Sequence, residues 1–222
     1  MKFGELGKGF IRKREKRDVG VFIDGTGLDR ATRRINRKVD MPALLRGVTS
    51  GNTPVFARYY TLIPYEDDSR QRAFLDAVAR AGMTVIVKRL PPKGITRQVS
   101  VDLEMAADMV AFSLGHLQFS KENEYTPSES FSRANSSGFG PSGASPDTDE
   151  QREPASEESG GSALKSIVVV CPSRELAYPM SLIKDVGADT TTADFGQFNT
   201  GDILKSAAKW IDLSDSETIW RP

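Results

Sequence analysis

Two acidic groups stand where the sequence predicts the start of a loop or a helix. Asp24 directly follows the apolar run Val19–Ile23 and precedes Gly25-Thr26-Gly27, so a carboxylate lies on a flexible loop at the end of a predicted strand. Ligands of open α/β sheets bind at the carboxyl ends of the strands. Asp24 is therefore a candidate functional residue, although an Asp at such a turn can also cap the helix expected to begin near Asp29.

The second acidic group comprises Asp102, Glu104 and Asp108, in a helix expected over about Val101–Leu114. A carboxylate at the helix start meets favourable charge from the helix dipole. Glu104 and Asp108 share one face, whereas at about 100° per residue Asp108 lies roughly 240° round the helix from Asp102. Asp102 and Asp108 can serve one site only if Asp102 lies at the frayed helix start. For Glu104 and Asp108 the alternative is ordinary surface charge.

Acids gathered in one cleft would favour chemistry with a hard cation. Mg²⁺ or Mn²⁺ bound by carboxylate oxygens can orient a water molecule against a phosphodiester. The chain has one His, His116, and one Cys, Cys171, which excludes a two-histidine mechanism and a His/Cys zinc cluster. His116 is expected to cap a helix. Phe22 stands where haloacid dehalogenase phosphatases carry a nucleophilic Asp, which excludes an aspartyl-phosphate mechanism.

The elements that must position these acids follow from alternating strand-like and helix-like runs. Five short β-branched or apolar runs predict strands at Val19–Ile23, Val55–Tyr60, Met83–Val87, Ile167–Val170 and Asp189–Ala193. Helical spacing extends over Asp67–Ala81, Val101–Leu114, Glu175–Val186 and Gly201–Trp210. Alternation of this kind indicates a mostly parallel sheet covered by helices.

Composition separates one foldable domain from its flanking segments. A chain of 222 residues with 38% hydrophobic content favours a single domain, which we assign to residues 19–119 and 165–213. Residues 120–164 hold 11 Ser, 5 Gly and 4 Pro, with nine acids against three bases. Such a stretch cannot offset its ordering entropy by burial, so it predicts a disordered acidic insertion. Residues 1–18 form a basic N-terminal tail, and residues 214–222 form a C-terminal tail.

The charge of the chain is unevenly distributed. The insertion carries −6, so the remainder carries +6, because the whole chain sums to zero. Basic residues concentrate at positions 12–17 and 30–38, which suits a phosphate-bearing partner, the alternative being a solvated tail and helix face. The single cysteine and a basic N-terminus without a signal-like apolar core predict a cytoplasmic protein. No apolar run approaches the roughly 20 residues that cross a bilayer, so no membrane contact is expected.

Several segments carry a family resemblance. They are Phe22-Ile23-Asp24-Gly25-Thr26-Gly27-Leu28, Arg58-Tyr59-Tyr60 with the segment 64–75, Val101-Asp102 through Ala107-Asp108, Cys171-Pro172-Ser173-Arg174-Glu175-Leu176, and the closing segment 201–213. Together they resemble the NYN (LabA-like) branch of the PIN-like nuclease superfamily. Four residues at three places depart from the family pattern: Gly27 replaces Asn, Val99-Ser100 replaces Lys-Gly, and Ser173 replaces the first acid of the fourth motif.

The resemblance implies a three-layer α/β/α PIN-like fold with a central, mostly parallel sheet of about five strands. It also implies a ribonuclease that hydrolyses single-stranded RNA with Mg²⁺ or Mn²⁺. The implied metal ligands are Asp24, Asp102, Ser173 and Glu175, and the implied catalytic acids are Asp24, Asp102, Asp108 and Glu175. The implied RNA-binding residues are Arg30, Arg33 and Arg34, with Lys93 or Arg97 in place of the missing Lys.

Two other classes of function remain open. The departures at Gly27, Ser173 and Val99-Ser100 are also compatible with an RNA-binding protein that has lost turnover. A third hypothesis is a regulatory module in which the insertion at 120–164 recruits a protein partner or is phosphorylated. Assembly into a homo-oligomer is compatible with each of the three.

Overall fold

The sheet that organises the chain has six strands, all parallel. The computed structural model describes residues 17–66, 69–127, 164–198, 201–215 and 217–221. The strands are β1 (Arg17–Asp24), β2 (Phe56–Ile63), β3 (Thr84–Arg89), β4 (Leu164–Val170), β5 (Asp189–Asp194) and β6 (Lys209–Asp212). Their order across the sheet is β3-β2-β1-β4-β5-β6, with parallel pairing at every step.

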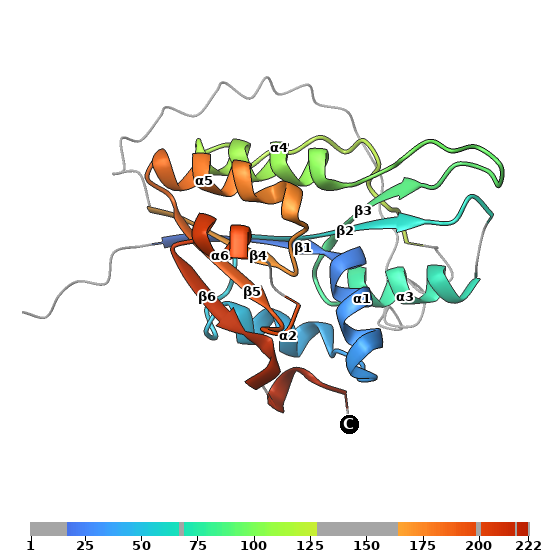
Figure 1. Cartoon of the computed structure of the whole chain (residues 1–222), viewed down its shortest axis with the longest axis horizontal. Coiled ribbons are helices and arrows are strands. Elements are labelled where there is room, and N and C mark those ends of the chain that lie inside the picture. The colour runs from blue at the N-terminus through green and yellow to red at the C-terminus, as the bar shows by residue number, and fades with distance from the viewer. Residues whose placement is uncertain (1–16, 67–68, 128–163, 199–200, 216, 222) are drawn as a thin grey trace, which may run out of the picture.

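Helices cover both faces of this sheet (Figure 1). One layer contains α1 (Gly25–Ile35), α2 (Met41–Val48) and α3 (Ser69–Arg80), and the other contains α4 (Asp102–Ser113), α5 (Ala177–Asp185) and α6 (Gly201–Ser206). The predicted three-layer α/β/α fold is therefore confirmed. Burial on both faces explains the nearly continuous apolar runs of the central strands, since each side chain must pack against one helix layer or the other.

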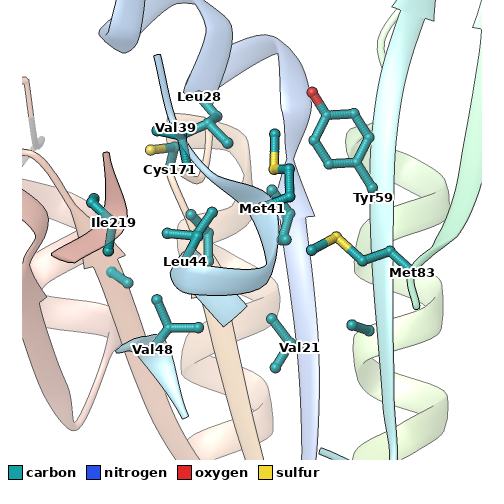
Figure 2. Packing of buried hydrophobic residues seen from close by; sticks show 14 of the residues in the cluster. Val21, Leu28, Val39, Met41, Leu44, Val48, Tyr59, Met83, Cys171 and Ile219 are labelled. Atoms are coloured by element: carbon teal, nitrogen blue, oxygen red, sulfur yellow. The ribbon is translucent and has the colours of Figure 1, made fainter. Parts of the chain in front are cut away.

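Alternate residues of β1 enter the two cores. Val21 and Ile23 pack under α1 and α2, whereas Phe22 packs with Tyr60 and α4 on the opposite face. Figure 2 shows the first core, in which Leu44 of α2 lies over β1 and β4. A one-residue slip of β1 would exchange these sets, so burial fixes the register that determines where Asp24 lies.

The structure corrects two predictions about helices. The predicted helix over Gly201–Trp210 ends at Ser206, and Lys209 and Trp210 instead begin β6, which pairs with β5. Sequence reasoning missed α2, which begins at the capping residue Asp40 and carries Pro42 in its first turn. Its eight residues are too few for a clear periodic signal.

The boundaries of the domain also move. Residues 214–222 are not simply a tail, because Ile219 and Trp220 are buried and Trp220 pairs with Val39. Part of the predicted insertion is ordered against β3, where the Tyr125 amide donates to the Val85 carbonyl and Glu124 forms a bridge with Ile86. The rest of the insertion, at 128–163, and the basic tail at 1–16 lie outside the described residues.

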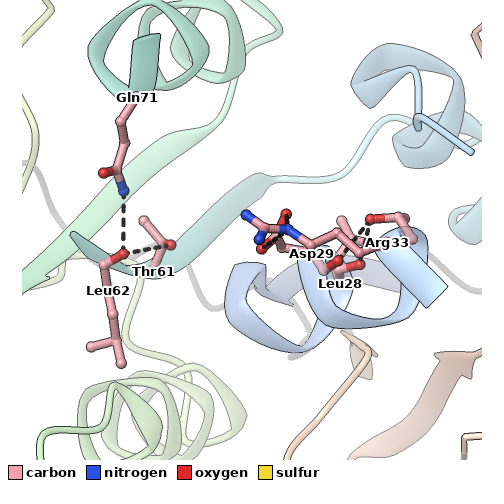
Figure 3. Close-up of polar contacts among 7 residues, drawn as sticks. Leu28, Asp29, Arg33, Thr61, Leu62 and Gln71 are labelled. Atoms are coloured by element: carbon pink, nitrogen blue, oxygen red, sulfur yellow. Dashed lines mark hydrogen bonds and ion pairs between the residues drawn. The ribbon is translucent and has the colours of Figure 1, made fainter. Parts of the chain in front are cut away.

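Helix α3 is fastened to the sheet by a polar contact as well as by its apolar face. Gln71 Nε2 donates to the carbonyl of Leu62 at 3.3 Å (Figure 3). The helices were also compared in length and apolar composition with a bilayer-spanning segment. Among the described residues, none of the helices is both long enough and apolar enough to cross a bilayer.

Candidate functional site

The site lies at the carboxyl ends of three neighbouring strands, β1, β4 and β5. Register pairs Ile23 of β1 with Val170 of β4, and Val170 with Ala193 of β5. The next residue in each strand is therefore Asp24, Cys171 or Asp194, side by side at the carboxyl edge. Parallel pairing produces this row, because all strands point their carboxyl ends the same way.

Asp24 is a buried carboxylate that also caps α1. Its side chain is almost fully enclosed and accepts a hydrogen bond from the Gly27 amide at 2.9 Å. The pKa of Asp24 is raised to about 6, chiefly by burial and also by the nearby charge of Asp102, while the amides of Gly27 and Thr26 and the cation of Arg30 oppose the rise. Capping and function are therefore not alternatives here, since one carboxylate can do both.

Gly27 stands where the family resemblance implies Asn, and its surroundings leave no room for a side chain. A Cβ at position 27 would lie 2.3 Å from the carbonyl oxygen of Cys171 and 2.9 Å from Asp24 Oδ2. Only glycine fits without moving the backbone of the β4 loop or the carboxylate itself. The loop after β4 thus approaches the first turn of α1 too closely for a side chain.

Asp102 reaches the same edge from the other helix layer. It begins α4, and its amide bonds to Ser100 Oγ at 2.9 Å, while the Ser100 hydroxyl also donates to Asp102 Oδ2. The second carboxylate oxygen accepts a hydrogen bond from Ser173 Oγ at 2.7 Å. Asp102 therefore lies at the helix start, and Ser173, which replaces an acid in the family motif, holds its carboxylate.

A cation that sequence reasoning missed lies beside Asp102. Lys88 Nζ, on β3, donates to the carbonyl of Ser100 at 2.8 Å and pairs with Glu104 at 2.7 Å. Lys93 and Arg97, the predicted substitutes for the missing Lys, lie instead on the exposed segment between β3 and α4. Lys88 was not considered because the predicted strand Met83–Val87 ended one residue before it, whereas β3 continues to Arg89.

Asp108 and Glu175 do not join this arrangement. Asp108 accepts hydrogen bonds from Arg58 Nη1 at 2.5 Å and from the Tyr60 hydroxyl at 2.6 Å, so its carboxylate is committed to holding α4 on β2. Its angular separation from Asp102 on α4 explains the outcome. Glu175 is exposed on the short helix η2 (Arg174–Leu176), and its neighbour Arg174 pairs with Asp202 of α6 at 2.9 Å.

Asp194 is the acid that sequence reasoning overlooked. It is buried at the end of β5, its carboxylate accepts the Phe195 amide at 2.7 Å, and burial with the charge of Asp212 raises its pKa to about 6. The predicted strand ended one residue earlier, at Ala193. Its position directly after a threonine-rich strand was the available signal, and it matches the position of Asp24 after β1.

A small cavity of about 150 Å³ lies between Asp24 and Asp194, and Asp102 borders it only through its hydrogen bond with Ser173. Its lining includes Asp24, Arg30, Arg34, Ser173, Asp194 and Phe198. The Arg34 guanidinium lies 5.3 Å from the centre of the Phe198 ring, which keeps a cation at the cavity wall. Arg33 lies on a different face of α1, where it pairs with Asp29.

The donor set suits a hard cation held by few protein ligands. No group of three or more His, Cys, Asp or Glu residues within the described ranges is placed to hold a metal, so the predicted set of Asp24, Asp102 and Glu175 does not form one. Mg²⁺ commonly uses one or two carboxylates and keeps several waters. Asp24 and Asp102 meet that need, and the buried Thr26 hydroxyl beside Asp24 lacks a hydrogen-bond partner in the described part of the chain.

Part of the chain matches a known protein family. Residues 18–117, which contain β1 to β3 and α4, match the NYN domain family. The chain carries an NYN domain. This is a nuclease-type domain of the PIN-like kind, and the match covers Asp24 and Asp102 but ends before β4. The match does not distinguish the LabA-like branch within the family.

The NYN chain is also similar to a solved structure. A crystal structure of a protein of unknown function from Vibrio parahaemolyticus has a TM-score of 0.61 and 11% sequence identity, covering 95% of this chain and 100% of that chain. At this identity the likeness shows the fold alone, and it extends that fold across β4, β5 and β6. No curated protein matches the chain.

Proposed function

We propose that this NYN-domain protein is a ribonuclease that hydrolyses phosphodiester bonds of single-stranded RNA with Mg²⁺ or Mn²⁺. The observation that carries the proposal is the approach of two acids to the carboxyl edge of the sheet: Asp24 lines the cavity there, and Asp102 accepts a hydrogen bond from Ser173, which lines the same cavity. Two acids that disfavour each other's charge are stabilised together by a cation.

Each residue has a defined part in this proposal. Asp24 and Asp102 would hold the cation, which when bound supplies charge stabilisation and a water of lowered pKa. Ser173 and Ser100 fix the rotamer of Asp102 by donating to its two oxygens. Arg30 and Arg34, on the α1 face that lines the cavity, would position phosphates. The chain's second buried acid at this edge, Asp194, adds negative charge that strengthens cation binding.

Cleavage of end-labelled single-stranded RNA by the full chain with Mn²⁺ tests the proposal. Asp24→Asn and Asp102→Asn should each abolish cleavage, and the double variant should be no worse than either single variant, because the two acids act as a unit. Asp185→Asn, at the exposed end of α5, is the matched control and should cleave normally. If wild type and both site variants leave the RNA equally intact, the proposed ribonuclease activity is wrong.

A second candidate function is RNA binding without turnover. It is favoured by Ser173 in place of an acid and by the absence of a three-acid group among the described residues. RNA retention that falls steeply with salt, with no cleavage in Mn²⁺, would select this candidate, since neutralised phosphates release counterions. Retention that does not change with salt would count against both candidates.

A further inference from the structure

Helix α1 separates two hollows of different character. Gly27, Arg30, Ala31 and Arg34 line the acidic cavity described above. Leu28, Asp29, Thr32, Arg33 and Asn36 line a larger cavity of about 440 Å³ on the other side of the helix. The two sets follow helical spacing, so each occupies its own face. The second cavity takes no part in the proposed chemistry, and its size is that of a small-molecule site.

The floor of the larger cavity is apolar and aromatic. Met41 and Tyr59 are buried there, and Phe74 of α3 stands at its edge with 38% of its surface exposed. The rings of Tyr59 and Phe74 are 6.1 Å apart and inclined at 68°. Figure 2 shows Tyr59 beside Met41, with its hydroxyl directed toward the end of the sheet where β1 runs into α1. A flat aromatic ligand would find an edge and a face to pack against.

Tyr59 also brings a polar group to the cavity, because its hydroxyl can donate and accept hydrogen bonds. The residue is only 2% exposed, so little of it is open to bulk water. Its ring packs so tightly under Gly25 that a Cβ at position 25 would lie 2.5 Å from the hydroxyl oxygen. A ligand atom within reach of the hydroxyl would form a hydrogen bond with it.

The rim of the cavity is strongly basic. Arg33, Arg37, Lys38 and Arg221 line it, against the single acid Asp29. Asp29 pairs with Arg33 at 3.0 Å along α1 (Figure 3), so three cations remain. The Arg37 guanidinium stacks 4.3 Å from the centre of the Trp220 ring, which leaves its N–H edges open to an anion. The Arg221 amide donates to the Lys38 carbonyl at 2.8 Å, which brings those two side chains to one place.

From this combination we infer that the cavity binds one nucleotide, with its base against Phe74 and Tyr59 and its phosphate at Arg37, Lys38 and Arg221. Aromatic walls accept any base by stacking, and clustered Arg and Lys side chains bind phosphate. The nucleotide has two sources, a free mononucleotide or one residue of an RNA strand that crosses α1 toward Asp24. For the RNA source the inference rests on the proposed function, whereas for the free mononucleotide it does not.

The test is calorimetric titration of the full chain with adenosine 5′-monophosphate, in EDTA so that no cleavage occurs. Tyr59→Phe removes only the hydroxyl and should weaken binding about two- to tenfold, as expected for one hydrogen bond. The double variant Lys38→Glu/Arg221→Glu should weaken it at least about tenfold and reduce its salt dependence. Lys184→Glu, on the exposed side of α5, is the control and should bind like wild type.

A decaadenylate strand distinguishes the two sources. If it binds more tightly than the mononucleotide and loses that advantage in the double variant, the cavity holds a residue of RNA. If it binds no more tightly, the ligand is a free nucleotide. Both titrations are made without a metal ion and measure binding alone, so failure of the nuclease proposal would leave the mononucleotide result standing.

Absence of binding by either probe would overturn the inference, and the apolar floor would then fit a side chain of a protein partner. Equal affinity of wild type and the double variant would overturn it as well. Thermal unfolding of each variant identifies any that fail to fold, and Tyr59→Phe, which keeps the ring in place, preserves the test in that case.

Discussion

The two ends of the sheet treat their acids in opposite ways. At the amino end, Asp18 pairs with Lys165 at 2.8 Å, and Asp189 pairs with Arg17 at 3.1 Å and Lys209 at 2.5 Å. At the carboxyl end, Asp24 and Asp194 are buried with hydrogen bonds only from backbone amides, and the pKa of each is raised to about 6. Ion pairs at the amino end join neighbouring strands. At the carboxyl end the ionised form of each buried acid is unfavourable, and a bound cation would stabilise it.

This contrast indicates that the buried acids at the carboxyl end of the sheet lower the stability of the fold. Paired acids at the amino end are satisfied within the protein, so nothing external is needed there. Buried acids at the carboxyl end oppose folding at neutral pH, and such groups persist where they serve binding or catalysis. Strands β1 and β5 show both behaviours, since each carries a paired acid at or near its start and a buried acid at its end.

The largest expected effect is on activity. Asp24→Asn should lower Mn²⁺-dependent RNA cleavage on the order of a hundredfold or more, whereas Asp189→Asn should leave the rate near wild type. Because Asp24 must be ionised to hold a cation, the wild-type rate should rise with pH through about 6. Initial rates between pH 5 and pH 8 measure both effects. A rate equally sensitive to both substitutions would remove the functional distinction between the two ends.

The second effect is on stability: the substitution of Asp24 that lowers activity should stabilise the fold. The pKa of Asp24 is raised from 3.8 to about 6 in the folded state, so the native protein binds a proton that the unfolded chain releases. Stability therefore falls as pH rises from about 4 to 6 and levels off above that. Asp24→Asn keeps the helix cap and should raise the free energy of unfolding by about 1–3 kcal/mol at pH 7.5.

Urea unfolding at pH 4 and pH 7.5 measures this change. The gain should be small at pH 4, where the native carboxyl is already protonated. Mn²⁺ should raise the stability of wild type but not of Asp24→Asn, because only a native state that binds the ion is stabilised. A variant that is less stable than wild type at pH 7.5 would show that Asp24 is satisfied in the fold like Asp189.

The third effect tests the close approach at the carboxyl end. Gly27→Ala should destabilise the protein by about 1–3 kcal/mol, because its Cβ would meet the Cys171 carbonyl. Gly201→Ala is the matched control, since nothing lies within 4 Å of a Cβ there, and it should be neutral or stabilising. Thermal unfolding compares the two. Equal melting temperatures of the two variants would mean that the loop after β4 moves away from the new Cβ at little cost in free energy.

The smallest effect belongs to the amino end. Asp189→Asn should lower the free energy of unfolding by about 0.5–1 kcal/mol, since its partners are largely solvent-exposed cations. Added salt should reduce the difference between variant and wild type, because it screens such pairs. Unfolding in low and high salt measures this. A loss that persists at high salt would show that Asp189 contributes through packing and not through charge.

Much of the fold was predictable because its signals are local. The runs Val19–Ile23 and Ile167–Val170 are apolar enough to require burial on both faces, and that alone indicates a parallel sheet between helices. Elements with weaker signals were lost: α2 is short, and Lys209–Asp212 becomes a strand only because β5 offers it an edge. The burial of Trp220, which pairs with Val39 and packs against the Phe195 ring, depends on contacts far apart in the chain, and no local pattern encodes them.

By itself, the sequence determined that Asp24 follows a buried strand and that Asp102 opens a helix, because strand period and helix starts are written in neighbouring residues. Only the tertiary structure decided which other groups join them. Asp108 accepts hydrogen bonds from Arg58 and Tyr60, Glu175 is exposed on the surface, and Asp194 lines the cavity of the site. Direction on a helix and register between strands set those outcomes, and both are fixed by packing of the whole domain.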